Sequence, residues 1–145
     1  MKIMVPLDTS DLSASAIPQA EELAKAMGAE LLLVTVLEPR VQASLREFAE
    51  IEGAQFAEVV EDHLRGAAEG IDGVPVTTET LTADDAATAL VDRADRGDVD
   101  MVVIASHGRS AMQRWMMGSV SERVVRGSTV PVLVVPAPWR AIRRS

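Results

Sequence analysis

Met101-Val-Val-Ile-Ala105, then Ser106-His107-Gly108, nine further residues and Gly118-Ser119-Val120-Ser121: this stretch decides the fold. A short apolar run rich in β-branched residues is typical of a strand buried on both faces. Ser119 is followed three residues later by Glu122, a capping-box pattern that predicts a helix whose N-cap is Ser119. The unpaired N–H groups and the positive dipole end at such a helix start favour an anion.

Outward from this stretch, short apolar runs alternate with longer amphipathic segments. The sequence predicts five strands, at 3–7, 31–37, 74–81, 101–105 and 131–135. Between them it predicts helices at about 12–27, 41–70 and 83–96. Strands that alternate with helices indicate βαβ units with right-handed crossovers. We therefore expect one domain over residues 1–145, an α/β fold with an open five-stranded parallel sheet and helices on both faces.

Two further helix ends can be read from the sequence. Gly28 follows the first amphipathic segment and is a plausible C′ residue with positive φ. Thr82, with Asp85 three residues later, makes a second capping-box pattern and predicts that a helix begins at about residue 83. In parallel sheets, ligands bind beyond the carboxyl ends of the strands. The residues of interest therefore include Asp8, the segment after Leu37 and the segment after Ala105.

Composition restricts the classes of function. The chain has 145 residues, 48% of them apolar, and no cysteine, so disulfide and thiolate chemistry are excluded. A net charge of −8 argues against bulk nucleic-acid binding, because no positive field attracts a polyanion. The apolar runs are too short to span a membrane, and no secretory signal opens the sequence. We expect a soluble cytoplasmic protein with no membrane partner.

Charge is unevenly distributed along the chain. Residues 1–100 carry a balance of −14, from 7 Lys/Arg and 21 Asp/Glu, whereas residues 101–145 carry +6, from 7 Arg and Glu122. One interpretation is a chance skew plus a basic tail, formed by Arg140, Arg143 and Arg144. The other is that a small anion is handled near four arginines, which are Arg109, Arg114, Arg123 and Arg126. The skew alone does not decide between them.

The residues of the central stretch have both structural and ligand-binding interpretations. Gly108 permits a positive φ and a close approach of the backbone to a ligand, or it only turns a loop. Ser119 caps a helix, donates its hydroxyl proton to a phosphate oxygen, or does both. Ser121 supplies a second hydroxyl. His107 is read as a loop donor, and the sequence offers no catalytic residue and no dedicated metal site.

The spacing Ala105-x2-Gly108-x9-Gly118-Ser119 resembles the Gly-x2-Gly-x9-Gly-Ser/Thr pattern of the nucleotide-binding branch of the universal stress proteins. The opening Met4-Val-Pro-Leu-Asp8 is similar to the first strand and acidic turn of that family. The resemblance covers the whole chain. Ala105 departs from the family's first glycine; because it ends a strand, we expect the added methyl group to be tolerated. Neither G-x4-G-K-S/T nor G-x-G-x-x-G is present.

The resemblance implies a fold and a binding site. The fold is similar to the adenine nucleotide alpha hydrolases, with strand order 3-2-1-4-5. The ligand implied is ATP or AMP, with any Mg²⁺ carried on the phosphates. Pro6 and Asp8 would border the adenosine, although Asp8 is alternatively a turn or N-cap residue, and Val36 or Leu37 would offer backbone groups to the adenine. The remaining implied residues, for ribose and phosphates, are Ala105, Gly108, Arg109, Gly118, Ser119, Val120 and Ser121.

The leading interpretation is an adenine-nucleotide-binding regulatory protein of the stress response. One alternative is a slow ATP hydrolase that uses the same pocket, and another is a nucleotide-free interaction module. The last strand predicts a homodimer: Val132–Val135 is wholly apolar and lies at a sheet edge in the implied order, which leaves backbone groups for a second chain. The alternative is that residues 137–145 cover this edge.

Overall fold

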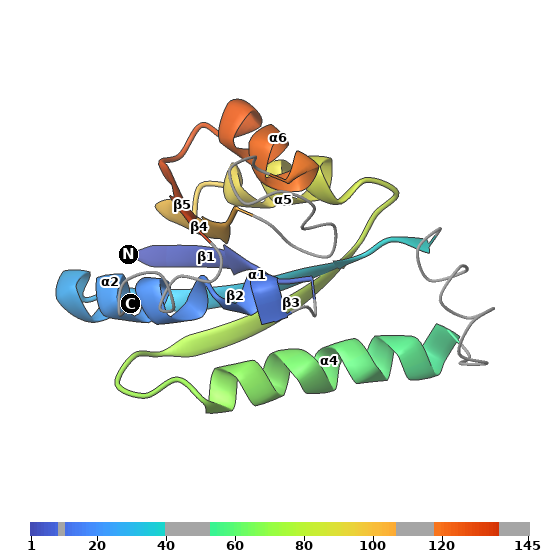
Figure 1. Cartoon of the computed structure of the whole chain (residues 1–145), viewed down its shortest axis with the longest axis horizontal. Coiled ribbons are helices and arrows are strands. Elements are labelled where there is room, and N and C mark those ends of the chain that lie inside the picture. Colours follow the sequence, from blue (N-terminus) through green and yellow to red (C-terminus); the bar gives the residue numbers. More distant parts are fainter. Residues whose placement is uncertain (9–10, 40–52, 107–117, 137–145) are drawn as a thin grey trace.

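A computed structural model describes residues 1–8, 11–39, 53–106 and 118–136 of the chain. The strands are β1 (Lys2–Pro6), β2 (Glu30–Leu37), β3 (Val76–Thr82), β4 (Met101–Ala105) and β5 (Val132–Val135). The helices are α1 (Asp11–Ala14), α2 (Ile17–Met27), α4 (Gly53–Glu69), α5 (Ala86–Ala94) and α6 (Ser119–Gly127). Figure 1 shows these elements in chain order.

All five strands form one parallel sheet in the order β3-β2-β1-β4-β5. The predicted fold class and strand order are therefore confirmed. The chain builds outward from the central β1 to β2 and β3, then crosses over to β4 and β5 on the other side. Adjacent strands β1 and β4 thus have connections that leave in different directions, which makes their boundary the switch point of the sheet.

Helices cover both faces of the sheet, as expected: α2 and α4 lie on one face and α5 and α6 on the other (Figure 1). Alternate residues of each strand enter one of two apolar cores. Ile3, Val5 and Leu33 pack with α2 and α4, while Met4 and Val34 pack with α5 and α6. Because both faces are buried, the strands read as continuous apolar runs in the sequence.

Helix boundaries differ from the sequence prediction at two places in the first three helices. The segment predicted as a helix at 12–27 is two helices, α1 and α2, and Pro18 stands in the first turn of the second, where its missing N–H costs nothing. Gly28 does close α2, with φ of 65°. Thr82 is the last residue of β3, not a cap; Asp85 is the N-cap of α5, and its carboxylate accepts from the Thr88 N–H at 3.3 Å.

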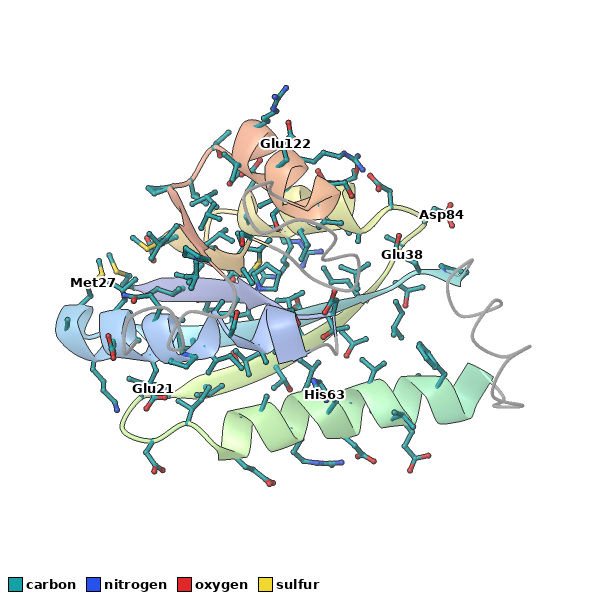
Figure 2. All side chains as sticks on the ribbon, in the orientation of Figure 1. Glu21, Met27, Glu38, His63, Asp84 and Glu122 are labelled. Carbon is teal, nitrogen blue, oxygen red and sulfur yellow. The ribbon has the colours of Figure 1, made fainter. Side chains whose placement is uncertain are left out.

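The helix predicted at 41–70 is confirmed only from Gly53 on, as α4; residues 41–52 lie outside the described residues. His63 is half-buried on this helix (Figure 2).

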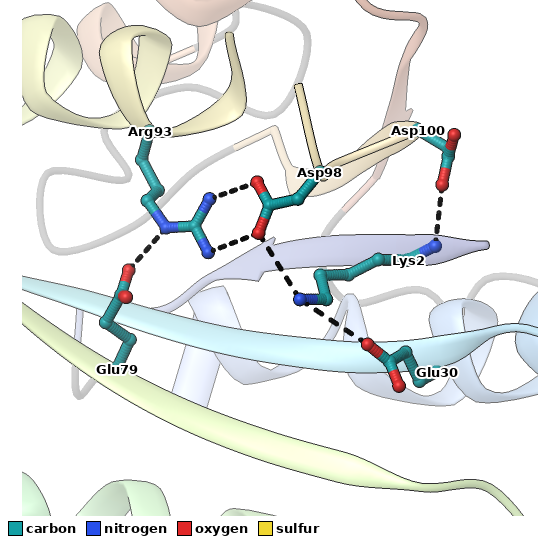
Figure 3. A network of polar contacts seen from close by, with 6 residues as sticks. All are labelled: Lys2, Glu30, Glu79, Arg93, Asp98 and Asp100. Carbon is teal, nitrogen blue, oxygen red and sulfur yellow. Dashed lines mark hydrogen bonds and ion pairs between the residues drawn. The ribbon is translucent and has the colours of Figure 1, made fainter. Parts of the chain in front are cut away.

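A network of charged side chains joins the amino edge of the sheet to α5 (Figure 3). Arg93, only 5% exposed, donates to Glu79 at 2.6 Å and to both oxygens of Asp98 at 2.7 and 3.1 Å. Lys2 Nζ lies 3.3 Å from Asp98 and 3.4 Å from Glu30. We call this set the amino-edge network; its members are Lys2, Glu30, Glu79, Arg93, Asp98 and Asp100.

Candidate functional site

A pocket opens at the carboxyl ends of β1 and β4, at the switch point of the sheet. Its cavity volume, measured within the described residues, is about 130 Å³. The walls come from the strands β1, β2 and β4, from α1 and α5, and from the first turn of α6. The described lining residues are Pro6, Leu7, Asp8, Ser13, Val34, Val36, Ala86, Leu90, Ile104, Ala105, Gly118, Ser119, Val120 and Ser121. We call it the carboxyl-edge pocket.

The start of α6 presents backbone donors at this pocket. Gly118 is the N-cap, with φ −62° and ψ 155°, and its N–H donates to the Ser106 carbonyl at 2.6 Å. The first intrahelical bond runs from the Glu122 N–H to the Gly118 carbonyl at 3.0 Å. The N–H groups of residues 119–121 precede it and so have no intrahelical acceptor. The N-cap is therefore Gly118, one residue before the predicted N-cap, and Ser119 is the first residue of the helix.

The two serines of α6 differ in their surroundings. Ser119 is exposed beside the pocket. Ser121 is 5% exposed, and its hydroxyl donates to the Ala105 carbonyl at 2.7 Å. That bond uses the single hydroxyl proton of Ser121 to join α6 to the end of β4. Ser119 is thus better placed than Ser121 to donate a hydroxyl proton to a ligand.

The end of β1 forms another wall of the pocket. Pro6 is buried, and Asp8 is half-buried just beyond the strand. The Asp8 N–H donates to Ser13 Oγ at 3.1 Å, which ties the turn after β1 to helix α1. Val36 contributes the opposite, apolar wall, whereas Leu37 does not line the pocket, and its carbonyl accepts from the Ala83 N–H at 3.0 Å. Of the two residues expected near an adenine, only Val36 lies at the pocket.

Both described arginines of α6 are paired with acidic side chains. Arg123 forms a two-pronged pair with Asp85, with 2.7 Å between Arg123 Nη1 and Asp85 Oδ1, and Arg126 lies 2.8 Å from Glu122. Hydrogen bonds from Arg123 and Thr88 hold the pKa of Asp85 well below its usual value, and Asp85 in turn raises the pKa of Arg123. The positive charge of these two side chains is therefore largely compensated within the protein. Arg109 and Arg114 lie outside the described residues.

The structure brings together eight of the ten residues singled out from the sequence. The eight line one pocket: Pro6, Asp8, Val36, Ala105, Gly118, Ser119, Val120 and Ser121. Gly108 and Arg109 fall outside the described residues, as does His107. Ala105 ends β4, paired with Val135, so the position departing from the family glycine is a strand residue, as expected.

Six lining residues were not predicted. Val34 could have been found, because it lies two positions before Val36 on the same face of its strand. Leu7 lies between two predicted residues. Ala86 and Leu90 are four positions apart on α5, a helical spacing that ordinary core residues also show. The other two are Ser13 and Ile104.

Among the described residues, no group of three or more His, Asp or Glu side chains could hold a metal ion. No helix in the same part of the chain is long and apolar enough to cross a membrane.

Comparison with known proteins decides the family. Residues 1–136 match the universal stress protein family. The chain belongs to this family. The universal stress protein MJ0531 of Methanocaldococcus jannaschii is 32% identical over 143 aligned residues, covering 94% of this chain and 82% of that protein.

Two solved structures extend the comparison to three dimensions. That of hypothetical protein MJ0577 has a TM-score of 0.78 at 25% identity and covers 92% of this chain and 94% of its own. A universal stress protein solved in complex with cAMP has a TM-score of 0.68 at 25% identity, covering 93% of this chain and 95% of its own.

Proposed function

We propose that this universal stress protein binds an adenine nucleotide, ATP or AMP, in the carboxyl-edge pocket and acts as a regulatory protein in a stress response. The observation that carries the proposal is the coincidence of this pocket with the start of α6. The pocket lies at the switch point of a parallel sheet, where such folds bind ligands. Its wall includes Gly118 and Ser119, at a helix start that favours a phosphate.

The walls of the pocket suit the two halves of a nucleotide. Val34, Val36 and Leu90 form an apolar side on which a flat base can lie. Two polar residues of the lining are Asp8, just after β1, and Ser119, at the start of α6. An apolar pocket with few polar groups is the usual design of a small-molecule site. The related protein solved with cAMP supports an adenine ligand. Mg²⁺ carried on the phosphates belongs to the same proposal.

The direct test is to identify what the purified protein retains. Acid extraction followed by chromatography should release an adenine nucleotide, and titration calorimetry of the emptied protein should show binding of AMP and ATP. Titration with cAMP in the same series ranks the three ligands. An emptied protein that binds none of the three would overturn the proposal and favour the nucleotide-free interaction module.

Ser119→Ala tests the phosphate end of the pocket. The loss of one hydrogen bond to a charged oxygen costs ~1.5–3 kcal/mol, so AMP affinity should fall roughly 10- to 150-fold. Ser128→Ala is the matched control, because Ser128 follows the far end of α6 and is not among the pocket residues. Equal affinities of the Ser119→Ala variant and the unmodified protein would remove Ser119 from the site.

We further propose that two copies pair through β5. This strand is an edge of the sheet, and Leu133 is 37% exposed on it. The Pro131 and Val135 carbonyls accept from β4 neighbours Val102 and Ser106 at 2.9 and 2.8 Å. Because ladder bonds alternate with a two-residue period, the backbone groups of residues 132 and 134 point away from β4. An antiparallel second copy would satisfy them.

Light scattering after size exclusion tests the dimer. The expected mass is twice the 15.5 kDa of one chain. Leu133→Lys should shift the mass to that of the monomer, whereas Val59→Lys, at an exposed apolar position on α4, should leave the dimer intact. A dimer unaffected by Leu133→Lys would exclude this edge as the contact.

A further inference from the structure

One ion pair joins the first turn of α5 to α6 beside the pocket. Asp85, the N-cap of α5, accepts hydrogen bonds from Arg123 Nη1 and Nη2, and Arg123 Nη2 also donates to Thr88 Oγ1 at 3.3 Å. The same carboxylate accepts from the Thr88 N–H. Two-pronged pairing fixes the relative orientation of the two groups more tightly than a single contact does. The pair therefore holds two helices together and caps one of them.

The pair lies at one end of a longer contact between these helices. At the other end, Asp95 accepts from the N–H and the hydroxyl of Thr129, at 3.2 and 2.7 Å. Between the two ends, Gly127 approaches Val91 so closely that an added Cβ would lie 3.2 Å from a methyl carbon. Polar contacts therefore join α5 and α6 at both ends of their interface. The Asp85–Arg123 pair is the one nearer the pocket.

The pocket lies between the elements that the pair connects. Ala86, directly after Asp85, and Leu90 line it from α5. The first turn of α6, residues 118–121, lines it from the other helix. A change in the separation of α5 and α6 would move these two walls relative to each other, and with them the backbone donors at the start of α6.

We propose that Arg123 and Asp85 are positioning residues that hold the start of α6 at the place where it receives a nucleotide phosphate. This inference rests on the proposed function. The side chains are 53% and 43% exposed, so the pair contributes little to the stability of the fold. Binding is more sensitive, because donors held in place before the ligand arrives avoid the entropy cost of ordering them.

A direct attraction between Arg123 and the phosphate predicts a different result. If Arg123 itself bound the ligand, removing Asp85 would release the guanidinium and strengthen binding. If the pair positions α6, removing either partner weakens binding. Asp85→Ser makes this distinction cleanly, because serine is also a good N-cap and keeps an acceptor for the Thr88 N–H.

The experiment compares AMP with adenosine, which lacks the phosphate, by calorimetry on four variants. Arg123→Met and Asp85→Ser should each lower AMP affinity about tenfold, a typical coupling between sites, and change adenosine affinity by less than about twofold. The double variant should be no weaker than either single one, because the two changes break the same contact. Arg123→Lys, which restores the charge with a single contact, should recover part of the loss.

Arg126→Met is the matched control. It removes the same charge from the same helix, but Arg126 is 78% exposed and pairs with Glu122. AMP affinity should stay within about twofold of the unmodified protein. Equal losses in the Arg123→Met and Arg126→Met variants would overturn the positioning role in favour of general charge attraction.

The remaining outcomes separate this inference from the proposed function. Tighter AMP binding in Asp85→Ser would assign Arg123 to the ligand and overturn the positioning role. Unmodified protein that binds AMP, with variants that bind equally well, would overturn the positioning role alone. Unmodified protein that binds neither AMP nor adenosine would overturn the proposed function and this inference with it. Thermal unfolding of each variant should show midpoints close to that of the unmodified protein.

Discussion

The two edges of the sheet are built in different ways. At the amino-edge network, charged side chains take one another as partners: Arg93 is enclosed by Glu79 and Asp98, and Lys2 bridges Asp98 and Glu30. At the carboxyl edge, the pocket is lined by apolar side chains, backbone groups at a helix start and the exposed Ser119. The first edge satisfies its polar groups internally, while the second presents donors to whatever enters the pocket. Under the proposed function, the network contributes to stability and the carboxyl-edge pocket to binding.

The largest expected effect comes from replacing one arginine at each edge, Arg93 or Arg123, with methionine. Arg93→Met removes the centre of the amino-edge network and should lower the free energy of unfolding by about 2–3 kcal/mol. This is less than the roughly 3–5 kcal/mol of a fully buried pair, because Glu79 and Asp98 are 32% and 45% exposed. Arg123→Met should leave the unfolding free energy almost unchanged and weaken AMP binding.

Urea unfolding and calorimetry on both variants measure the two effects separately. Arg96→Met, at an exposed position close to Arg93 in the chain, is the stability control. A large loss of stability in Arg123→Met would contradict the different roles of the two edges. So would weaker AMP binding in Arg93→Met together with unchanged AMP binding in Arg123→Met.

Ala105→Gly, at the carboxyl-edge pocket, should lower the free energy of unfolding by less than Arg93→Met does. The loss of a buried methyl group and the added freedom of glycine should lower stability by about 1–2 kcal/mol. AMP affinity should change by less than about tenfold, or ~1.4 kcal/mol, because Ala105 is an ordinary strand residue. Calorimetry checks this directly. A gain of a hundredfold would instead mean that the methyl group obstructs the ligand.

Acid should produce the smallest effect. Hydrogen bonds from Arg93, and then from Lys2, lower the pKa of Asp98 in the folded protein. At pH below the ordinary value of Asp, about 4, the unfolded chain therefore binds more protons than the folded one. The stabilisation from Asp98 is present above that pH and is lost as the pH falls toward the lowered folded value.

Urea midpoints followed from about pH 6 to pH 3 test this linkage. Asp98→Asn should make the decline in stability with acid shallower, and an unchanged slope would show that Asp98 does not contribute to it. Asp85→Asn is a useful comparison, because Asp85 has a lowered pKa at the other edge and asparagine still caps the helix.

The fold could be predicted from the sequence because its strands are buried on both faces. Continuous apolar runs such as Leu31–Leu37 and Met101–Ala105 have few alternatives, and their alternation with helices determines a parallel sheet. Helix ends could not be predicted to the residue, because more than one nearby polar residue can act as the N-cap. Thr82 and Asp85 both suit an N-cap, and only the length of β3 decides between them.

The site could be predicted in part, since residues at strand ends converge in any parallel sheet. Asp8, Ala105 and Ser119 are near one another for that reason. Charge pairing could not be predicted in the same way: Arg123 and Asp85 are 38 positions apart, and their contact depends on how α5 and α6 pack. The basic character of the last third of the chain left two interpretations open, a chance skew and cations available to an anion. In the structure, both described arginines of α6 have acidic partners.

The N-cap of helix α6 is a glycine, Gly118, which has no side chain to accept the first N–H groups of the helix. Under the proposed function, a bound phosphate accepts hydrogen bonds from these N–H groups. The nucleotide then supplies hydrogen bonds that the folded protein lacks without it. Occupancy and unfolding are then linked by mass action, by about 2.7 kcal/mol at a hundredfold excess of ligand over Kd. The survival time of the protein in heat or under proteolysis would then rise and fall with the nucleotide concentration around it.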